Sequence, residues 1–465
     1  MIGKKIYTDV FKAVLLSSLC ASSALAANEF TGSLSINNAQ VLNTQASNAT
    51  VPSVEINHPV MYTITNATGN AFYKVYVSGG LPKHFVQEDV AGQINCPTSA
   101  AQGITLLAGA TCKLSGYFTA ASPYQPNGSV HWNVLVDYST DAKSAPTTSE
   151  QLALSSMGVS QPVYVFGDSL SDMGNINAMN LTGPYTNNIE PTTPVNKDAK
   201  TWADYLAVAF GNDGIKASEQ CDGEPKICGT DFAVGGAVAG PLPAGFEGFQ
   251  ATLLSSELDK FFAIHPGKID SNAVYAIWAG GNNLLYPALL APEKITDDYL
   301  KDSVIAINES VGRLKEMGAT QIVVFNLPPV GNVPAFKEQT ALRDTLNERV
   351  IYFNNQLQTA IDELNRANPQ HPVKLIDIHK IFANYIAAFK PGEPYGPGND
   401  IFQNITDNCY AEAGSNDPSM DPTQNVIRNA CKEQNGDWFY FDAVHPSGKA
   451  HKFIWNNIKA EFAGL

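Results

Sequence analysis

The hydrophobic period of this chain changes near Gln161, and this change limits the folds that the second part of the chain can adopt. Before that point apolar residues recur at every second position, as in strands with one buried face. After it, amphipathic segments alternate with short apolar runs, which are 163–166, 232–234, 274–278, 322–325 and 373–378. Parallel strands joined by helices form a doubly wound α/β sheet, which we predict for residues 162–465.

Two of the amphipathic segments have a helical pattern. The first begins after Thr296 as N-cap, ends at Gly318, and has one apolar face made of Leu300, Val304, Ile307, Val311 and Leu314. The second has the same pattern at Leu346, Val350, Phe353, Leu357 and Leu364. Because ligands of doubly wound sheets bind beyond the carboxyl ends of the strands, we expect the functional residues directly after the apolar runs.

The length of 465 residues exceeds the ~250–300 residues at which a single core tends to divide, so we expect two domains. Alternating apolar residues in 27–138 predict a small β-sandwich without helices. Ser, Thr, Ala and Pro are frequent in 139–161, which we predict to be a linker. The stretch 106–114 resembles the late strands of bacterial immunoglobulin-like domains.

Residues 1–26 predict a secretory signal peptide. Lysines precede an apolar stretch, and the small residues around Ala24 and Ala26 precede the predicted cleavage site. Cys20 follows a leucine rather than a small residue, which does not fit a lipoprotein signal. No later apolar run approaches the ~18 residues that cross a bilayer. We therefore expect an exported protein, in the periplasm or outside the cell, without an integral membrane segment.

Six cysteines follow Cys20, an even number in a chain that we expect to reach an oxidising compartment. They form three local couples, for which we favour pairing within each couple over metal binding: Cys96 with Cys112, Cys221 with Cys228, and Cys409 with Cys431. No Cys-x-x-Cys or histidine cluster with ligand spacing accompanies them, so we predict no metal site. Nothing in the sequence indicates an organic cofactor.

The formal net charge of −15 indicates which partners the chain can bind. A strongly acidic surface repels polyanions, so nucleic acid and strongly anionic membranes are poor candidate partners. Neutral or zwitterionic lipids, other esters and sugars remain as candidate ligands. The N-terminal domain is a candidate surface for a polysaccharide or a protein.

Ser169 and His445 are the first candidates for chemistry. Ser169 follows the apolar run 163–166 in a Gly-Asp-Ser turn, which places its hydroxyl at the carboxyl edge of the predicted sheet, beside unpaired backbone N–H groups. His445 lies far downstream in Asp-Ala-Val-His. A serine hydroxyl is a weak nucleophile until an imidazole accepts its proton, so we interpret the two as nucleophile and base.

Four short motifs occur in a fixed order along the chain. They are Gly-Asp-Ser-Leu at 167–170, Ala-Val-Gly-Gly-Ala at 233–237, Gly-Gly-Asn-Asn at 280–283, and Asp-Ala-Val-His at 442–445. This ordered set resembles the SGNH or GDSL hydrolase family, and the resemblance spans about 162–465. The long first motif, Phe-Gly-Asp-Ser-Leu-Ser-Asp, and a later Leu-Pro-Pro at 327–329 are most similar to secreted bacterial lipases, phospholipases and glycerophospholipid acyltransferases.

The resemblance implies roles for one residue in each of the first three motifs and for two residues in the fourth. Ser169 would be the nucleophile, His445 the base and Asp442 its orienting acid, while Gly236 and Asn282 would donate to the oxyanion together with the Ser169 N–H. These roles fit acyl transfer, because a carboxylate holds the imidazole tautomer and fixed donors stabilise the tetrahedral oxygen. The chain departs from the family at Asn283, where an aspartate is usual.

Other residues receive structural interpretations. Asp172 and Asn175 are expected to brace the first helix rather than touch substrate. The long segment between 378 and 442, which ends in Trp-Phe-Tyr-Phe at 438–441, is either a lid offering aromatic surface to an acyl chain or a tethered surface loop.

We therefore predict a secreted serine esterase acting on lipid esters, as a phospholipase A or lysophospholipase, with an alcohol or sterol as an alternative acyl acceptor. Two other interpretations remain open. One is a carbohydrate O-acetylesterase on the same scaffold, and the other is a binding protein with an inactive hydrolase domain.

Overall fold

The computed structural model describes most of the chain after the predicted signal peptide. The described residues are 30–36, 39–43, 51–56, 58–78, 81, 85–119, 129–130, 134–152, 157–175, 200–212, 214–222, 227–247, 249–411, 426–434 and 436–462. The predicted signal peptide and Cys20 lie outside them.

The N-terminal part of the chain consists of β-strands, as the alternation of apolar residues predicts. Their bounds are β1 Phe30–Ile36, β2 Ala39–Asn43, β3 Val51–Glu55, β4 Val60–Asn66, β5 Phe72–Val77, β6 Phe85–Gln87, β7 Ile104–Leu106, β8 Thr111–Phe118, β9 Ser129–Val130 and β10 Val134–Ser139, with one short 3-10 helix, Ala100–Gln102. One sheet has the order β2-β1-β4-β8-β6, and a second contains β10, β5 and β7. Tyr62 and Leu114 from the first sheet share one hydrophobic core with Val75 and Val136 from the second.

The prediction of a linker at 139–161 has to be corrected, because this segment contains two strands. β11 (Thr148–Leu152) pairs antiparallel with β10, and β12 (Met157–Ser160) pairs parallel with β3. Strand pairing uses backbone groups, so the polar β11, at the edge of its sheet, can pair without the apolar alternation that sequence analysis detects. The N-terminal strands therefore continue nearly to the start of the α/β part.

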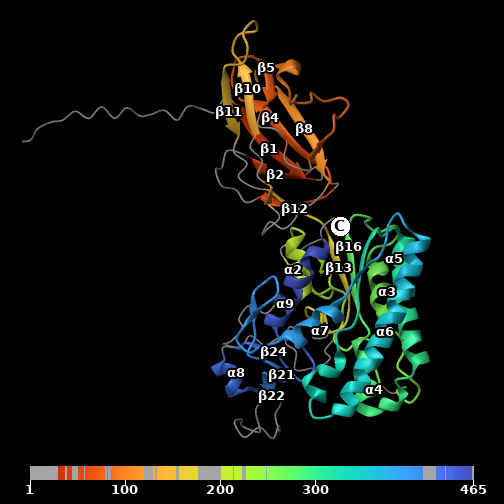
Figure 1. Cartoon of the computed structure of the whole chain (residues 1–465). Helices are drawn as coiled ribbons and strands as arrows, with labels where there is room; N and C mark the ends of the chain where they lie inside the picture. Colours follow the sequence, from red (N-terminus) through yellow and green to blue (C-terminus); the bar gives the residue numbers. More distant parts are fainter. Residues whose placement is uncertain are drawn as a thin grey trace, which may run out of the picture.

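The α/β part is built on a parallel sheet with the order β13-β16-β17-β18. These strands are Val163–Gly167, Val274–Trp278, Gln321–Phe325 and Lys374–Ile376. The helices are α2 Trp202–Ala209, α3 Leu254–Ile264, α4 Gly281–Leu290, α5 Asp297–Met317, α6 Thr340–Ala367, α7 Ile378–Ala388, α8 Asn429–Glu433 and α9 Gly448–Ile458. Figure 1 shows α2 and α9 on one side of the sheet and α3, α5 and α6 on the other. The predicted α/β class with a parallel sheet is confirmed.

Short elements complete this part of the chain. They are the strands β14 Cys221–Asp222, β15 Ile227–Cys228, β19 Pro394–Tyr395, β20 Asp400–Ile401, β21 Asn404–Asn408, β22 Tyr410–Ala411, β23 Val426–Ile427 and β24 Trp438–Tyr440, and the 3-10 helices Pro292–Lys294, Val330–Asn332, Pro334–Phe336 and Lys459–Phe462.

The prediction of a strand at 232–234 also has to be corrected, because this apolar run is not a regular strand. It lies beside β13 through two backbone hydrogen bonds, in which Phe232 N–H donates to Val165 O at 2.7 Å and Val234 N–H donates to Gly167 O at 3.0 Å. The Asp231 carboxylate accepts from the Ala233 N–H, so this donor is used locally rather than in a ladder. Counting this segment, the order along the sheet is the flavodoxin-like 2-1-3-4-5.

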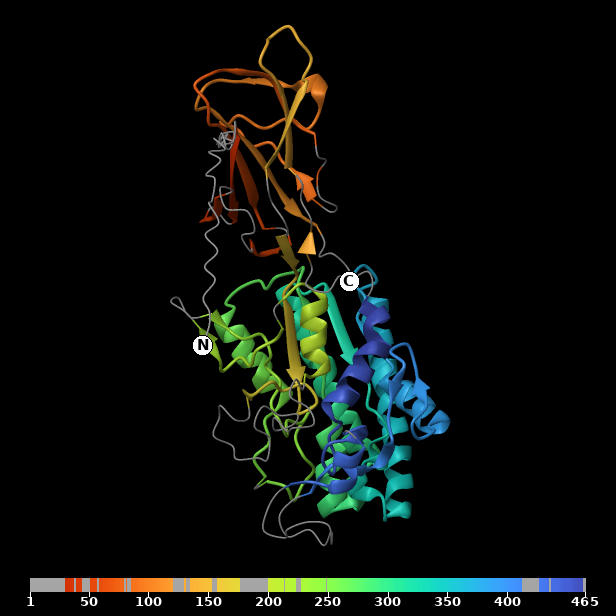
Figure 2. The ribbon, with the colours of Figure 1, turned by 90° about the vertical axis from the view of Figure 1, so that its left-hand side faces the viewer.

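The two predicted helices are present. Thr296 Oγ1 accepts from the Tyr299 N–H at the start of α5, and Gly318 ends this helix with φ 112°. The apolar faces of α5 and α6 are buried in one core with the sheet. In Figure 2 the arrow of β13 points away from the N-terminal strands, so the carboxyl ends of the parallel strands face away from them.

Candidate active site

The turn after β13 exposes Ser169 because its first residue has to be glycine. Gly167 has φ 139°, and a Cβ there would lie 2.0 Å from the carbonyl oxygen of Trp278 on the neighbouring strand. The buried Glu257 carboxylate accepts from the Gly167 N–H at 2.8 Å. The chain therefore leaves the sheet in a fixed direction, and Ser169 lies half-buried directly beyond the strand end.

His445 lies within hydrogen-bond distance of Ser169, although 276 positions separate them in sequence. The distance from Ser169 Oγ to His445 Nε2 is 2.7 Å. On the other side of the ring, Nδ1 lies 2.8 Å from Asp442 Oδ2 and 3.0 Å from Oδ1. Asp442 Oδ1 also accepts from the backbone N–H groups of Val444 and His445, at 2.9 and 2.7 Å. The aspartate thus holds both the turn and the imidazole.

The electrostatic setting favours charge separation across this pair. Burial lowers the pKa of His445, but the charge and hydrogen bond of Asp442 oppose this effect, and the net pKa lies above its usual value. Burial raises the pKa of Asp442, whereas His445 and the backbone donors lower it, and the net pKa lies below the usual value. An imidazolium formed by taking the serine proton is therefore stabilised where it forms.

A third carboxyl group, that of Asp168, directly precedes Ser169 in the turn. Asp168 is buried, and this burial raises its pKa to about 6, although the Leu170 N–H and His445 act in the opposite direction. Its Oδ1 accepts from the Leu170 N–H at 3.1 Å. This group braces the turn that presents Ser169.

Two cavities meet at Ser169. The first is lined mainly by apolar side chains, among them Leu170, Leu327, Val330, Val333, Phe382 and Ile454. The second is lined by Gly235, Gly236, Gln250, Thr252 and Tyr286, with Phe249 and Leu289. Ser169, Asn282 and His445 border both cavities. An ester placed at Ser169 would therefore have one compartment on each side of its carbonyl carbon.

The two residues predicted to form an oxyanion hole lie in this place. Gly236 and Asn282 line the second cavity together with Ser169 and His445. Asn282 Nδ2 donates to the Ala237 carbonyl at 2.9 Å, which orients the amide. The Gly235 N–H donates to the Asp172 carboxylate at 2.6 Å, so this donor is occupied by the protein. Gly236 rather than Gly235 is therefore the better candidate donor.

Asn283, which stands where the resemblance leads us to expect an aspartate, has a structural role. It is fully buried, and its Oδ1 accepts from the Ala239 N–H at 2.8 Å. Its Nδ2 donates to the Gly240 carbonyl at 3.0 Å and to the Tyr299 hydroxyl oxygen at 3.1 Å. Asn283 thereby ties α4 to the segment after the glycine loop, which we define as residues 234–237.

The three predicted cysteine couples are joined as disulfides in the structure. Cys96 and Cys112 lie in the core of the N-terminal part. Cys409 and Cys431 are buried in a small cluster with Tyr410, Trp438 and Phe441.

The predicted lid falls partly on residues 412–425, which lie outside the described residues. Within the aromatic stretch 438–441 all four side chains are buried. Tyr440 lines the apolar cavity, whereas Trp438 and Phe441 pack around the Cys409–Cys431 disulfide. Most of this aromatic surface is therefore core.

Sequence analysis did not single out Glu257 or Tyr286. Both act on glycines of the motifs, since Glu257 binds the Gly167 N–H and the Tyr286 hydroxyl donates to the Gly236 carbonyl at 3.1 Å. Tyr286 lies one helical turn after Asn282, and this spacing was the available signal. Glu257 has no comparable signal, because its position depends on how α3 packs against β13.

In the part of the chain that the structure describes, no group of three or more His, Cys, Asp or Glu residues could hold a metal ion. Among the same described residues, no helix is long and apolar enough to span a membrane.

Comparison with known proteins gives one match to a family model. The model described as GDSL-like lipase/acylhydrolase matches residues 163–458. A GDSL esterase/lipase of Arabidopsis thaliana is 24% identical over 319 residues, covering 64% of this chain and 85% of the plant protein. Lipase 1 of Photorhabdus luminescens is 29% identical over 187 residues, covering 40% of this chain and 25% of that protein.

Solved structures give weaker matches. A member of the lipolytic G-D-S-L family from Veillonella parvula aligns with a TM-score of 0.34 at 11% identity, covering 66% of this chain and 100% of that one. Phospholipase A1 from Streptomyces albidoflavus aligns with a TM-score of 0.30 at 13% identity, covering 63% of this chain and 97% of that one.

Proposed function

The chain belongs to the GDSL-like lipase/acylhydrolase family, and from that premise we propose that it is a secreted serine esterase that hydrolyses lipid esters. The observation that carries this proposal is the chain of contacts from Ser169 Oγ to His445 Nε2, at 2.7 Å, and from His445 Nδ1 to Asp442 Oδ2, at 2.8 Å. A hydroxyl, an imidazole and a carboxylate in this order are what acyl transfer through serine requires.

The proposed reaction has two halves. Ser169 Oγ attacks the ester carbonyl carbon while its proton passes to His445 Nε2, and the oxygen of the tetrahedral intermediate accepts from the N–H groups of Ser169 and Gly236 and from the Asn282 amide. The imidazolium then gives its proton to the leaving alcohol as the C–O bond breaks, which leaves an acyl-serine. Water attacks this ester with His445 again as base, and the carboxylic acid leaves as Ser169 regains its proton.

The lining of the two cavities supports a lipid ester over a sugar acetate. The first cavity offers aliphatic side chains and Phe382 to whatever enters it, and an acyl chain longer than acetate is the part of an ester that gains from such a surface. The second cavity carries the polar side chains of Gln250 and Thr252, which suit a polar alcohol. We assign the acyl chain to the first cavity and the leaving alcohol to the second.

Two features of the proposal concern the rest of the chain. Export rests on the predicted signal peptide and on the three disulfides, which persist in oxidising compartments. We propose that the N-terminal strands form an immunoglobulin-like domain that contacts a polysaccharide or a protein.

The experiment that tests the proposal compares esters of one alcohol with different acyl chains. The mature protein should hydrolyse p-nitrophenyl palmitate and release fatty acid from phosphatidylcholine, and Ser169→Ala should abolish both activities. Ser171→Ala is the matched control, because this buried hydroxyl has no hydrogen-bond partner among the described side chains and its loss should leave turnover unchanged. Strict preference for p-nitrophenyl acetate would favour the O-acetylesterase, and full activity in Ser169→Ala would refute the mechanism. A second reaction with a sterol added shows whether an alcohol competes with water for the acyl group.

A further inference from the structure

The glycine loop, residues 234–237, is held from two sides by side chains to which the resemblance assigns no catalytic role. On the side of the nucleophile, Asp172 Oδ2 accepts from the Gly235 N–H at 2.6 Å. The other oxygen of the same carboxylate accepts from the N–H groups of Gly174 and Asn175, at 2.7 and 2.6 Å. One fully buried carboxylate therefore joins the turn that follows Ser169 to the loop that carries Gly236.

On the opposite side, Tyr286 from α4 holds the same loop. Its hydroxyl donates to the Gly236 carbonyl at 3.1 Å, and its ring packs on Phe249 with the centroids 4.4 Å apart. The fit is close, because a Cβ added at Gly236, where φ is 81°, would lie 2.6 Å from the Tyr286 hydroxyl oxygen. The peptide group that carries the Gly236 N–H thus lies between a peptide fixed by Asp172 and a peptide fixed by Tyr286.

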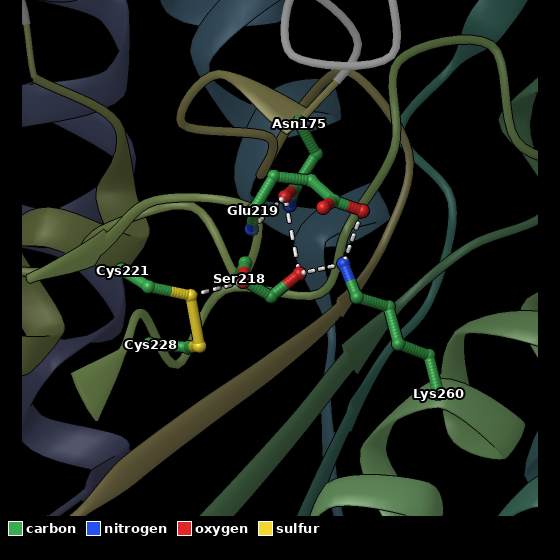
Figure 3. Close-up of a disulfide and its surroundings, with 6 residues drawn as sticks. All are labelled: Asn175, Ser218, Glu219, Cys221, Cys228 and Lys260. Carbon is green, nitrogen blue, oxygen red and sulfur yellow. Dashed lines mark hydrogen bonds and ion pairs between the residues drawn. A yellow bond between two sulfur atoms is a disulfide. The ribbon is translucent and has the colours of Figure 1, made fainter. Parts of the chain in front are cut away.

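A third side chain fixes the segment that leads into the loop. Asn175 is fully buried, and its Nδ2 donates to the carbonyls of Asp231 and Ala233, at 2.8 and 2.9 Å. Its Oδ1 accepts from the Ser218 hydroxyl and from the Glu219 N–H, both at 3.1 Å. Figure 3 shows Asn175 with Ser218 and Glu219 beside the Cys221–Cys228 disulfide, with Lys260 donating to Ser218.

We propose that Asp172 and Tyr286 are positioning residues that set the direction of the Gly236 N–H relative to Ser169, a role that rests on the proposed serine esterase. An oxyanion donor lowers the barrier only when its hydrogen points at the position that the oxygen occupies in the transition state. Asp172 is absent from the residues that line the two cavities beside Ser169, so it acts through Gly235 rather than on substrate. Tyr286 borders the second cavity, but its hydroxyl is bonded to the loop.

The sharpest test compares two variants that each lack one tyrosine hydroxyl, one near each end of the parallel sheet. Tyr286→Phe loses the bond to Gly236, and its matched control Tyr275→Phe loses an equivalent bond, in which the Tyr275 hydroxyl donates to the Asp270 carbonyl at 2.7 Å near the start of β16. The assays are kcat and KM for p-nitrophenyl butyrate and the rate of covalent inactivation by diethyl p-nitrophenyl phosphate. When Ser169 attacks the phosphorus of this inhibitor, negative charge also develops on the phosphoryl oxygen.

We expect Tyr286→Phe to lower kcat and the inactivation rate about tenfold, less than the loss of a whole oxyanion donor, which costs about 10²–10³-fold. KM should change little, because ground-state binding does not depend on the oxyanion. Tyr275→Phe should leave both rates unchanged, even if it lowers the melting temperature. Equal kinetic effects of the two variants, or no effect of Tyr286→Phe, would overturn the proposal.

Asp172→Asn tests the other side of the loop. An amide has one acceptor oxygen, so its NH₂ group must face either the Gly235 N–H or the paired N–H groups of Gly174 and Asn175, and one attachment is lost. We expect a larger fall in kcat than in Tyr286→Phe, measured on protein shown to be folded by circular dichroism. If this variant does not fold, the tyrosine pair still decides. Activity that does not depend on Ser169 would refute the proposed function, whereas Ser169-dependent activity unaffected by Tyr286→Phe would refute the positioning role alone.

Discussion

Asp442→Asn should inactivate the protein by changing the tautomer of His445 while leaving the turn intact. In the structure Asp442 Oδ1 accepts from the N–H groups of Val444 and His445, and the asparagine oxygen can keep both bonds. The amide nitrogen then takes the place of Oδ2, which lies 2.8 Å from His445 Nδ1. Because two donors cannot share a hydrogen bond, Nδ1 must become the acceptor and the ring proton moves to Nε2.

A proton on Nε2 removes the acceptor that lies 2.7 Å from Ser169 Oγ. The expected loss in kcat is about 10⁴-fold, the size found for this change in other serine triads, or about 5 kcal/mol of transition-state stabilisation. The assay is hydrolysis of p-nitrophenyl butyrate with active-site titration. Asp437→Asn is a control in the same segment, because the Asp437 carboxylate pairs with Lys449 and a partly exposed pair contributes little. If Asp442→Asn kept kcat within about tenfold of the unsubstituted protein, the tautomer argument would be wrong.

Three further predictions concern pH, the buried amide and the acyl cavity. First, kcat/KM should fall on the acid side with an apparent pKa above the usual 6.5 of histidine, because His445 is active only when neutral and Asp442 outweighs the effect of burial to raise its pKa; a rate profile over pH 5–9 with an acid limb below 6 would contradict this. Second, Asn283→Asp should lower the free energy of unfolding by about 1–3 kcal/mol, measured by urea denaturation at pH 8, because a carboxylate oxygen would then face the Gly240 carbonyl and the Tyr299 hydroxyl oxygen; unchanged stability would show that the site accepts either residue. Third, Val333→Phe should narrow the apolar cavity and reduce hydrolysis of p-nitrophenyl palmitate far more than that of the acetate, and an equal loss on both esters would place the acyl chain elsewhere.

The sequence predicts those parts of the fold whose signals are local and periodic. The apolar face of α5, its cap at Thr296 and its end at Gly318 are properties of consecutive residues, and the structure has all three. The prediction of a linker was wrong at β11, because the interactions that form this strand are not local in sequence. Backbone pairing with β10 holds that segment, and of its side chains Leu152 is buried in the shared core. A strand that is stabilised by a neighbour distant in sequence leaves little trace in its own composition.

The candidate site likewise has residues that the sequence predicts and contacts that it does not. Ser169, Asn282, Asp442 and His445 each lie in a short motif, and the turn geometry of each motif can be inferred from a few residues. The two contacts that fix the glycine loop cannot be inferred in this way, because Asp172 and Gly235 are 63 positions apart and Tyr286 and Gly236 are 50 positions apart. Their contacts exist only because the segment 230–234 lies along one side of β13 while β16 leads into α4 on the other. The sheet order therefore determines which side chains can reach the glycine loop. A relative that kept the four motif residues but repacked α4 would keep its nucleophile and base, yet lose the tyrosine hydroxyl that orients one oxyanion donor.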